Sequence, residues 1–212
     1  MQSELEALLA AAWQAVAARK DRRTGAAVEI PPLVPLEAPA VESRYAADFP
    51  VLRHLGAALA LARRCALAKL AARFERLLGG LAWSQNPGYD ARNCEAAFLD
   101  GYAYAAFSGP EGPVYCAAPR GGALLMAPHV TYPGHKHAPK EVYLILTPGA
   151  QWRLDAGEWF DVSPGDLIVH APWVTHSMRT TRHPLLAFAG WLEPGDRRDI
   201  AWSDHLTGEA GR

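Results

Sequence analysis

Short runs that favour β-strands fill the second half of the sequence, and this feature limits the possible folds most strongly. The runs alternate with turns marked by Gly and Pro, and they cover residues 102–107, 114–116, 123–131, 141–147, 151–154, 159–162, 166–170, 175–180 and 185–192. Many short strands at close spacing predict a β-sandwich or a β-barrel. We therefore expect a mainly β domain over residues 86–212.

The first 85 residues instead predict a helical region. Apolar residues recur at helical spacing between Ser3 and Lys20, and Ser3 with Glu6 forms a potential capping box at the start. A second stretch, 48–78, is rich in Ala and Leu and has a potential cap in Asp48. The chain is therefore expected to be mostly helical over residues 1–85.

The second helical stretch is one helix or two, because Gly56 is a possible break, and Gly79 is expected to end it. Before it, residues 24–40 contain four prolines and predict an extended connector. We find no candidate catalytic residues in the helical region. We expect it to act as a scaffold or to pair two chains into a homodimer.

Charge and cysteine usage exclude several classes of function. The formal net charge is −1, from 21 basic and 22 acidic residues, which does not favour binding to nucleic acid or to an anionic membrane. The three cysteines lie far apart, which argues against a disulfide framework and fits a reducing compartment. The first residues are acidic, unlike a signal peptide, and no apolar run approaches the about 18 residues of a membrane span. We therefore expect a cytoplasmic protein.

A cluster of potential metal ligands lies in the β-rich part, between Tyr132 and His176. His135 and His137 are two residues apart, so their side chains share one face of an extended chain. Glu141 follows four residues later, and His176 comes after a Pro-Gly-Asp turn. Three imidazoles and one carboxylate suit one divalent first-row metal such as iron, zinc, manganese or nickel. Such a set keeps positions open for water or substrate, as a catalytic metal needs.

This segment resembles the two motifs of the cupin superfamily. The first motif, HxHxxxE, is intact at residues 135–141, and the second is matched in kind by Gly165, Pro172 and His176. The glycine expected before the first motif is absent, as are the PxG glycine and the terminal Asn of the second. The resemblance covers roughly the last 110 residues and implies a C-terminal cupin β-barrel, or jelly roll, after the helical region.

A closer resemblance is to the cupin-type dimethylsulfoniopropionate (DMSP) lyases, through the pattern Tyr-Pro-x-His-x-His-x-x-x-Glu-x-Tyr at residues 132–143. The resemblance implies four metal ligands: His135, His137, Glu141 and His176. It also implies that Tyr132 and Tyr143 line the site and that one of them is the base. The implied reaction is that of a carbon–sulfur lyase, which converts DMSP to dimethyl sulfide and acrylate by β-elimination.

The chemistry of this reaction favours a tyrosine near the metal. The α-proton of DMSP is poorly acidic because the carboxylate is already negative, and a metal on that carboxylate would neutralise the charge. A nearby cation also favours tyrosinate over tyrosine, whose free pKa is about 10. Tyr143 shares a strand face with Glu141, so we predict Tyr143 as the base, with Tyr132 as the second candidate and as a substrate-binding residue.

The sulfonium end of the substrate favours aromatic faces through cation–π attraction. Trp173 lies three residues before His176, and we predict that it forms the pocket wall. The other histidines show no ligand pattern, and His129 and His170 are the first exceptions to consider because they lie in predicted strands.

Two alternatives to the lyase remain open from the sequence. The same ligands serve other cupin metalloenzymes, such as a dioxygenase or an isomerase, because fold and metal do not fix the reaction. A non-catalytic cupin that binds a metal or a ligand would also carry them. The Glu-x-Tyr spacing, with a second Tyr before the first histidine, favours the lyase.

Overall fold

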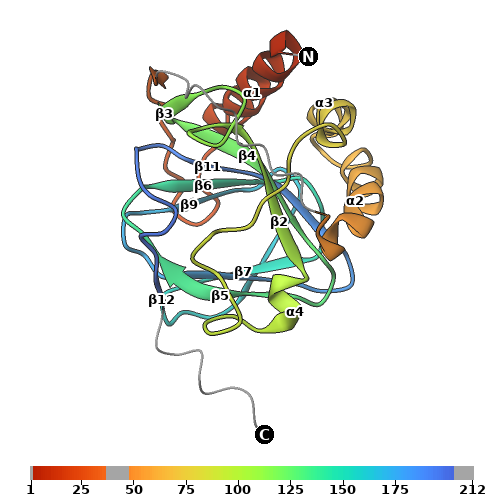
Figure 1. Ribbon diagram of the computed structural model, residues 1–212, viewed down its shortest axis with the longest axis vertical. Helices are drawn as coiled ribbons and strands as arrows, with labels where there is room; N and C mark the ends of the chain where they lie inside the picture. Colours follow the sequence, from red (N-terminus) through yellow and green to blue (C-terminus); the bar gives the residue numbers. More distant parts are fainter. Residues whose placement is uncertain (1, 37–47, 203–212) are drawn as a thin grey trace, which may run out of the picture.

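The computed structural model describes residues 2–36 and 48–202, which are mainly β (Figure 1). The helices are α1 (Gln2–Ala17), the 3-10 helix η1 (Pro50–His54), α2 (Leu55–Ala62), α3 (Ala68–Leu78) and α4 (Ala96–Leu99). The strands are β1 (Val34–Pro35), β2 (Tyr102–Ser108), β3 (Cys116–Ala118), β4 (Arg120–Met126), β5 (Thr131–Lys136), β6 (Glu141–Ile145), β7 (Ala150–Leu154), β8 (Phe160–Val162), β9 (Leu167–His170), β10 (His176–Thr180), β11 (Leu185–Trp191) and β12 (Ala201–Trp202).

Two five-stranded antiparallel sheets face each other (Figure 1). One has the strand order β2-β4-β11-β6-β9, and the other has the order β12-β5-β10-β7-β8. Strands β1 and β3 form a separate two-stranded pair. The prediction of a mainly β fold, with many short strands and a helical N-terminal region, is confirmed. The boundary at residue 85 stays a prediction.

The first predicted helix is present as α1, with different ends. It stops at Ala17 rather than at Lys20, because Lys20 pairs with Ala27 in an isolated β-bridge. Ser3 lies inside the helix, so the predicted capping box at Ser3 is wrong. Of the predicted connector, residues 28–33 have no regular structure, and residues 37–40 lie outside the described ranges.

The second predicted helix is divided into α2 and α3. The break lies at residues 63–67 and not at Gly56, which is inside α2. Gly79 follows the last residue of α3, as predicted. Asp48 is not a cap, because the chain first forms η1, whose N-cap residue is Phe49 and makes no side-chain capping bond.

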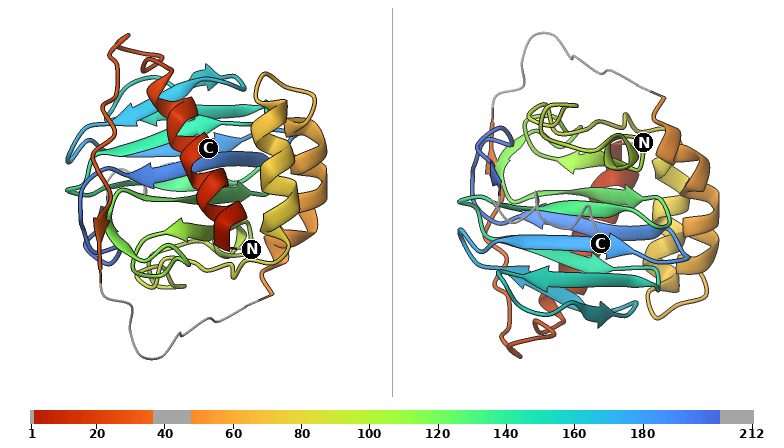
Figure 2. Two further views of the ribbon diagram at one scale, coloured as in Figure 1. Left: turned by 90° about the horizontal axis from the view of Figure 1, so that it is seen from above. Right: turned by 90° about the horizontal axis from the view of Figure 1, so that it is seen from below.

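Helix α1 lies across the outer face of the sheet that contains β11 (Figure 2). The edge of the Trp13 ring contacts Phe188 of β11, with ring centroids 4.9 Å apart. Gly190 makes room for this contact, since a Cβ there would lie 2.6 Å from the Trp13 ring. The buried face of α1 and the sheets therefore belong to one hydrophobic core.

The three cysteines are free, as their spacing predicted. No helix within residues 2–36 and 48–202 is both long enough and apolar enough to cross a bilayer.

Strand register brings the predicted site residues together. His135 of β5 is the cross-strand partner of His176, the first residue of β10. Glu141, the first residue of β6, lies between His170 of β9 and Trp191 of β11. The histidine pair thus comes from one sheet and the carboxylate from the other, and both point into the space between the sheets.

Candidate active site

The four predicted ligands lie together and are buried. Oε2 of Glu141 lies 3.3 Å from Nε2 of His137 and 3.2 Å from Nε2 of His176. His135, His137 and His176 form a group whose ring nitrogens lie within 4.8 Å of one another. Side chains from β5, β6 and β10, and from the residue after β5, therefore meet at one point.

Backbone carbonyls fix the orientation of all three imidazoles. Each Nδ1 lies 2.9 to 3.0 Å from the carbonyl oxygen of a residue two positions away in the chain: Pro133 for His135, Pro139 for His137 and Val174 for His176. A carbonyl can only accept, so each Nδ1 carries a proton and donates it. In the neutral rings the Nε2 lone pairs are then free to bind a metal, as is usual for metal-binding histidines.

The Nε2 atom of His176 shows that the site suits a cation. It is buried, and no residue in the described parts of the chain gives it a hydrogen bond of normal geometry. A buried nitrogen lone pair without a partner is costly. Together with His135, His137 and the Glu141 carboxylate, it makes a donor set that fits a divalent transition metal.

The pKa values in this group reflect burial and close packing. Burial, followed by the charge of His170, lowers the pKa of His176 to about 4. Burial and the neighbouring His176 hold the pKa of His135 well below its usual value. Burial alone would raise the pKa of Glu141, but the surrounding imidazoles keep it well below its ordinary range. For His137, burial lowers the pKa, but the charge of Glu141 and the hydrogen bonds of the ring together outweigh this effect and raise it. The group therefore favours an ionised Glu141 and neutral rings at His135 and His176, which are the forms that bind metal.

His170 is a member of this group that the ligand pattern did not include. Its Nε2 accepts a hydrogen bond from Nε1 of Trp152 at 3.1 Å. Because that nitrogen must accept, the proton of a neutral His170 lies on Nδ1, which is 3.0 Å from Oε2 of Glu141. His170 therefore donates to Glu141 and orients the carboxylate.

Trp191 holds the other oxygen of the same carboxylate. Its Nε1 donates to Oε1 of Glu141 at 2.9 Å, and its ring packs against His137 with centroids 4.7 Å apart. Both oxygens of Glu141 thus have a hydrogen-bond donor from a neighbouring strand.

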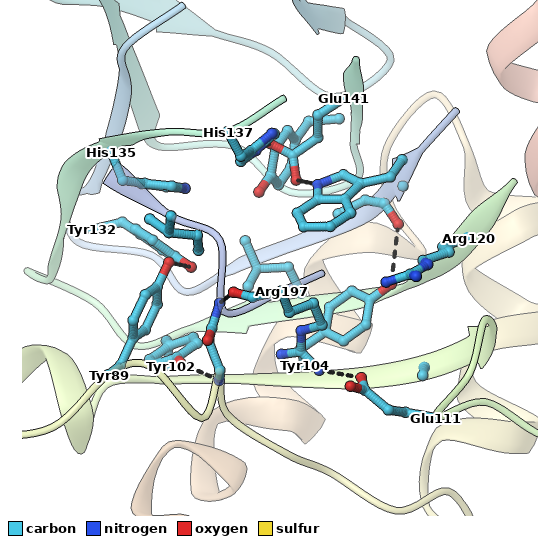
Figure 3. A pocket seen from close by; sticks show the side chains of 18 of the residues that line it. Tyr89, Tyr102, Tyr104, Glu111, Arg120, Tyr132, His135, His137, Glu141 and Arg197 are labelled. Carbon is cyan, nitrogen blue, oxygen red and sulfur yellow. Dashed lines mark hydrogen bonds and ion pairs between the residues drawn. The ribbon is translucent and has the colours of Figure 1, made fainter. Parts of the chain in front are cut away.

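A pocket lined by His135, His137 and Glu141 opens beside this group (Figure 3). Aromatic side chains make up much of its wall: Tyr89, Tyr102, Tyr104, Tyr132, Tyr143 and Trp191. Such a pocket suits a small ligand with both a cationic and an anionic group.

Both predicted tyrosines line the pocket. Tyr143 is two residues after Glu141 on β6, and its ring contacts Trp152 and His170, with centroids 5.3 and 5.4 Å away. Tyr132 stacks on His135, and its hydroxyl donates to the hydroxyl of Tyr89 at 2.9 Å. Burial raises the pKa of each predicted tyrosine well above its usual value, and the charge of Glu141 adds to this effect.

Trp173 does not form the pocket wall, so this prediction is wrong. Its side chain is 56 % exposed, and it lies outside the pocket lining. The residue sits in the turn between β9 and β10 with φ at 63°, and its backbone N–H donates to the carbonyl of His137. Strand alternation does not hold in such a turn, so the ring points to the surface.

The pocket also contains residues that sequence reasoning missed. Tyr89 comes from the loop before α4, and Arg197 comes from the loop after β11. Arg120, the first residue of β4, lies near them. None belongs to a motif, so no spacing signal connects them to the histidines. His170 could have been found, because it ends a predicted strand and faces the same side as the ligands.

Comparison with known proteins gives two curated relatives. The chain is 33 % identical over 160 residues to the putative dimethylsulfoniopropionate lyase DddL of Cereibacter sphaeroides, a match that covers 75 % of this chain and 66 % of the relative. It is 27 % identical over 103 residues to dimethylsulfoniopropionate lyase DddQ of Ruegeria pomeroyi, which covers 49 % of this chain and 51 % of the relative. The chain thus spans less than two thirds of the length of either relative.

Two solved structures share the fold over nearly the whole chain. A structure from a study of the DMSP lyases RdDddP and RnDddQII superposes with a TM-score of 0.69 at 20 % identity, and covers 95 % of this chain and 98 % of that one. DMSP lyase DddQ from Ruegeria pomeroyi superposes with a TM-score of 0.68 at 23 % identity, and covers 96 % and 98 %. These likenesses show the fold alone.

A family model gives the assignment. The model for dimethylsulfoniopropionate lyase matches residues 33–187, which is well over half of the chain. The match begins just before β1 and includes the histidines, Glu141 and both predicted tyrosines. The chain therefore belongs to the dimethylsulfoniopropionate lyase family.

Proposed function

We propose that this chain is a metal-dependent DMSP lyase that forms dimethyl sulfide and acrylate by β-elimination. The observation that carries the proposal is the position of Tyr143. It lies two residues from Glu141, on the same strand, and both line one pocket with His135 and His137. Membership of the family supports the same reaction.

The proposed ligands of the metal are His135, His137, Glu141 and His176. A divalent cation held there would supply positive charge beside the substrate carboxylate and Tyr143, and so would stabilise the negative charge that develops during proton removal. The ligand types are compatible with iron, zinc, manganese or nickel. His170 and Trp191 keep the carboxylate of Glu141 in place.

Tyr143 is the proposed base. Burial and the charge of Glu141 raise its pKa, and a metal cation held nearby would oppose that rise and favour the phenolate. As the phenolate it would take the proton from the carbon next to the substrate carboxylate. The electron pair of that C–H bond forms the C=C bond of acrylate, and the C–S bond breaks with its electrons leaving on dimethyl sulfide. The proton remains on the Tyr143 hydroxyl until it passes to solvent. Tyr132, whose hydroxyl already donates to Tyr89, is better placed to bind the substrate than to remove a proton.

The sulfonium group is proposed to lie against the tyrosine wall. Tyr89, Tyr102 and Tyr132 pack together with ring centroids 5.4 to 5.9 Å apart, and all three line the pocket. Their faces offer the cation–π attraction that the sequence predicts for Trp173. We also infer that the two facing sheets are the two halves of a cupin jelly roll.

The test is the release of dimethyl sulfide into the headspace after DMSP is added to the purified protein, with and without a chelator. We expect release that the chelator abolishes and that added metal restores. No release after each of the four metals has been supplied would contradict the proposal. Metal-dependent uptake of O₂ with other substrates would then point to a dioxygenase.

A further inference from the structure

The pocket has a second charged region that the proposed reaction does not use. Figure 3 shows His135, His137 and Glu141 on one side of the pocket and Arg197, with its neighbours Tyr104 and Glu111, on the other. Arg120 lines the pocket as well. The arginine side is defined here as Arg120, Arg197 and Glu111. It contains two guanidinium groups and one carboxylate, so it carries one excess positive charge.

The two arginines differ in their partners. Nη1 of Arg197 pairs with Oε2 of Glu111 at 2.6 Å, and its guanidinium lies over the ring of Tyr104 at 5.3 Å. The side chain of Arg197 is only 15 % exposed, so this ion pair is largely removed from water on the arginine's side. Arg197 is therefore already neutralised.

Arg120 has no such carboxylate. Within residues 2–36 and 48–202, its side chain makes one hydrogen bond, from Nε to the carbonyl oxygen of Ala117 at 3.2 Å. Its guanidinium lies over the ring of Trp191 at 5.6 Å, and the side chain is half-buried. Among the described residues, the Nη groups therefore have no acceptor, and their position is partly dehydrated. Burial lowers the pKa of Arg120, and the charge of Glu111 offsets this effect only in part.

We propose that Arg120 forms a second anion-binding subsite of the pocket, which binds the carboxylate of a small monocarboxylic acid. The planar guanidinium matches a carboxylate with two parallel hydrogen bonds, and aromatic surroundings strengthen them by excluding water. The excess positive charge excludes the sulfonium group from this position. The subsite is distinct from the histidine group. Trp191 contacts both, because its Nε1 donates to Glu141 and its ring lies below the guanidinium of Arg120.

Two sources could supply this carboxylate, and naming them rests on the proposed function. One is the substrate, held at Arg120 as it enters the pocket and before its carboxylate reaches the metal. The other is the product acrylate, held there as it leaves. Both present the same chemical group to the same guanidinium.

Calorimetric titration of the metal-loaded full chain with propionate tests the subsite. We expect Arg120→Gln to weaken propionate binding at least tenfold, and Arg120→Lys, which keeps the charge without the planar fork, to weaken it less. Glu111→Gln removes the carboxylate that pairs with Arg197 and partly offsets the charge of Arg120, and should tighten binding several-fold. The control is Arg153→Gln, because Arg153 also stacks on a tryptophan, at 4.7 Å from Trp159, but lies outside the pocket.

A second titration separates this subsite from the metal group. In His137→Ala, a propionate-binding component that depends on Arg120 should persist, whether or not the protein releases dimethyl sulfide. Equal propionate binding by wild type, Arg120→Gln and Arg120→Lys would overturn the proposal, as would unchanged binding in Glu111→Gln. Circular dichroism spectra of the variants would establish that each is folded.

Steady-state kinetics then identify the source. If Arg120 binds the substrate, Arg120→Gln raises KM for DMSP. If it binds the product, the variant leaves KM unchanged and weakens inhibition by acrylate. Either result supports the subsite.

Discussion

Nδ1 of His170 lies 3.0 Å from Oε2 of Glu141 and is oriented to donate to it. This contact links a strand-end histidine to the one carboxylate among the proposed ligands. His170→Ala removes the donor, so we expect metal affinity to fall about 10- to 100-fold, as is typical when the partner of a ligand is lost. Competition with a chromophoric chelator measures the affinity. His170→Asn, whose amide can still donate, should retain more of the metal affinity. Equal metal affinity in His170→Ala and wild type would contradict the proposal that His170 orients Glu141.

The proposed histidine ligands should determine the metal content of the protein. His137→Ala and His176→Ala should each lower the metal content of the purified protein well below one ion per chain, because each removes a nitrogen that faces the centre. Elemental analysis measures the content. His183→Ala is the matched control, since His183 contacts Arg182 and is remote from the pocket. Full metal occupancy in His137→Ala would rule out the assigned site.

Substitution of Tyr143 and of Tyr132 should have different kinetic effects. Tyr143→Phe is expected to lower kcat by about 10²- to 10⁴-fold, which is the usual contribution of a general base, with metal content unchanged. Tyr132→Phe loses the hydrogen bond to Tyr89 and should act mainly on KM. Headspace assays over a range of DMSP concentrations distinguish the two effects. Tyr115→Phe is the control, because Tyr115 lies outside the pocket. A larger loss of kcat in Tyr132→Phe than in Tyr143→Phe would make Tyr132 the base instead of Tyr143.

Trp191 and Trp173 should differ in their effect on stability. Trp191→Phe removes the donor to a buried, charged carboxylate, so the free energy of unfolding should fall by about 1.5–3 kcal/mol. Trp173→Ala alters a side chain that is 56 % exposed, and should change the free energy of unfolding by no more than about 0.5 kcal/mol. Urea unfolding followed by circular dichroism measures both. A loss of substrate affinity in Trp173→Ala would restore the original prediction of a pocket wall.

The sequence was informative where spacing alone determines direction. Tyr143 and Glu141 are two residues apart within one strand, so the alternation of side chains was enough to place them in the same pocket. His176 followed from the motif, but its exact position depends on its cross-strand pairing with His135. Local pattern and long-range pairing agree here, which is why the proposed ligand group could be predicted.

Other parts of the site could not be predicted in this way. Arg120, Arg197 and Tyr89 lie in segments far apart in the chain, and tertiary packing alone brings them to the pocket. Trp173 failed for a different reason: it was chosen because it is close to His176 in the sequence, but it lies in a turn with φ at 63° and its side chain is exposed. The break between α2 and α3 likewise came at residues 63–67, which contain no glycine.

The arrangement of ligands on opposite sheets links metal supply to folding. His135 and His176 belong to one sheet and Glu141 to the other, so an ion bound by all three would connect the sheets only in the folded chain. With free metal at 1,000 times its dissociation constant, this linkage would add about 4.1 kcal/mol to the stability of the folded state. A cell short of the metal would then lose the protein itself to unfolding and turnover, as well as its activity.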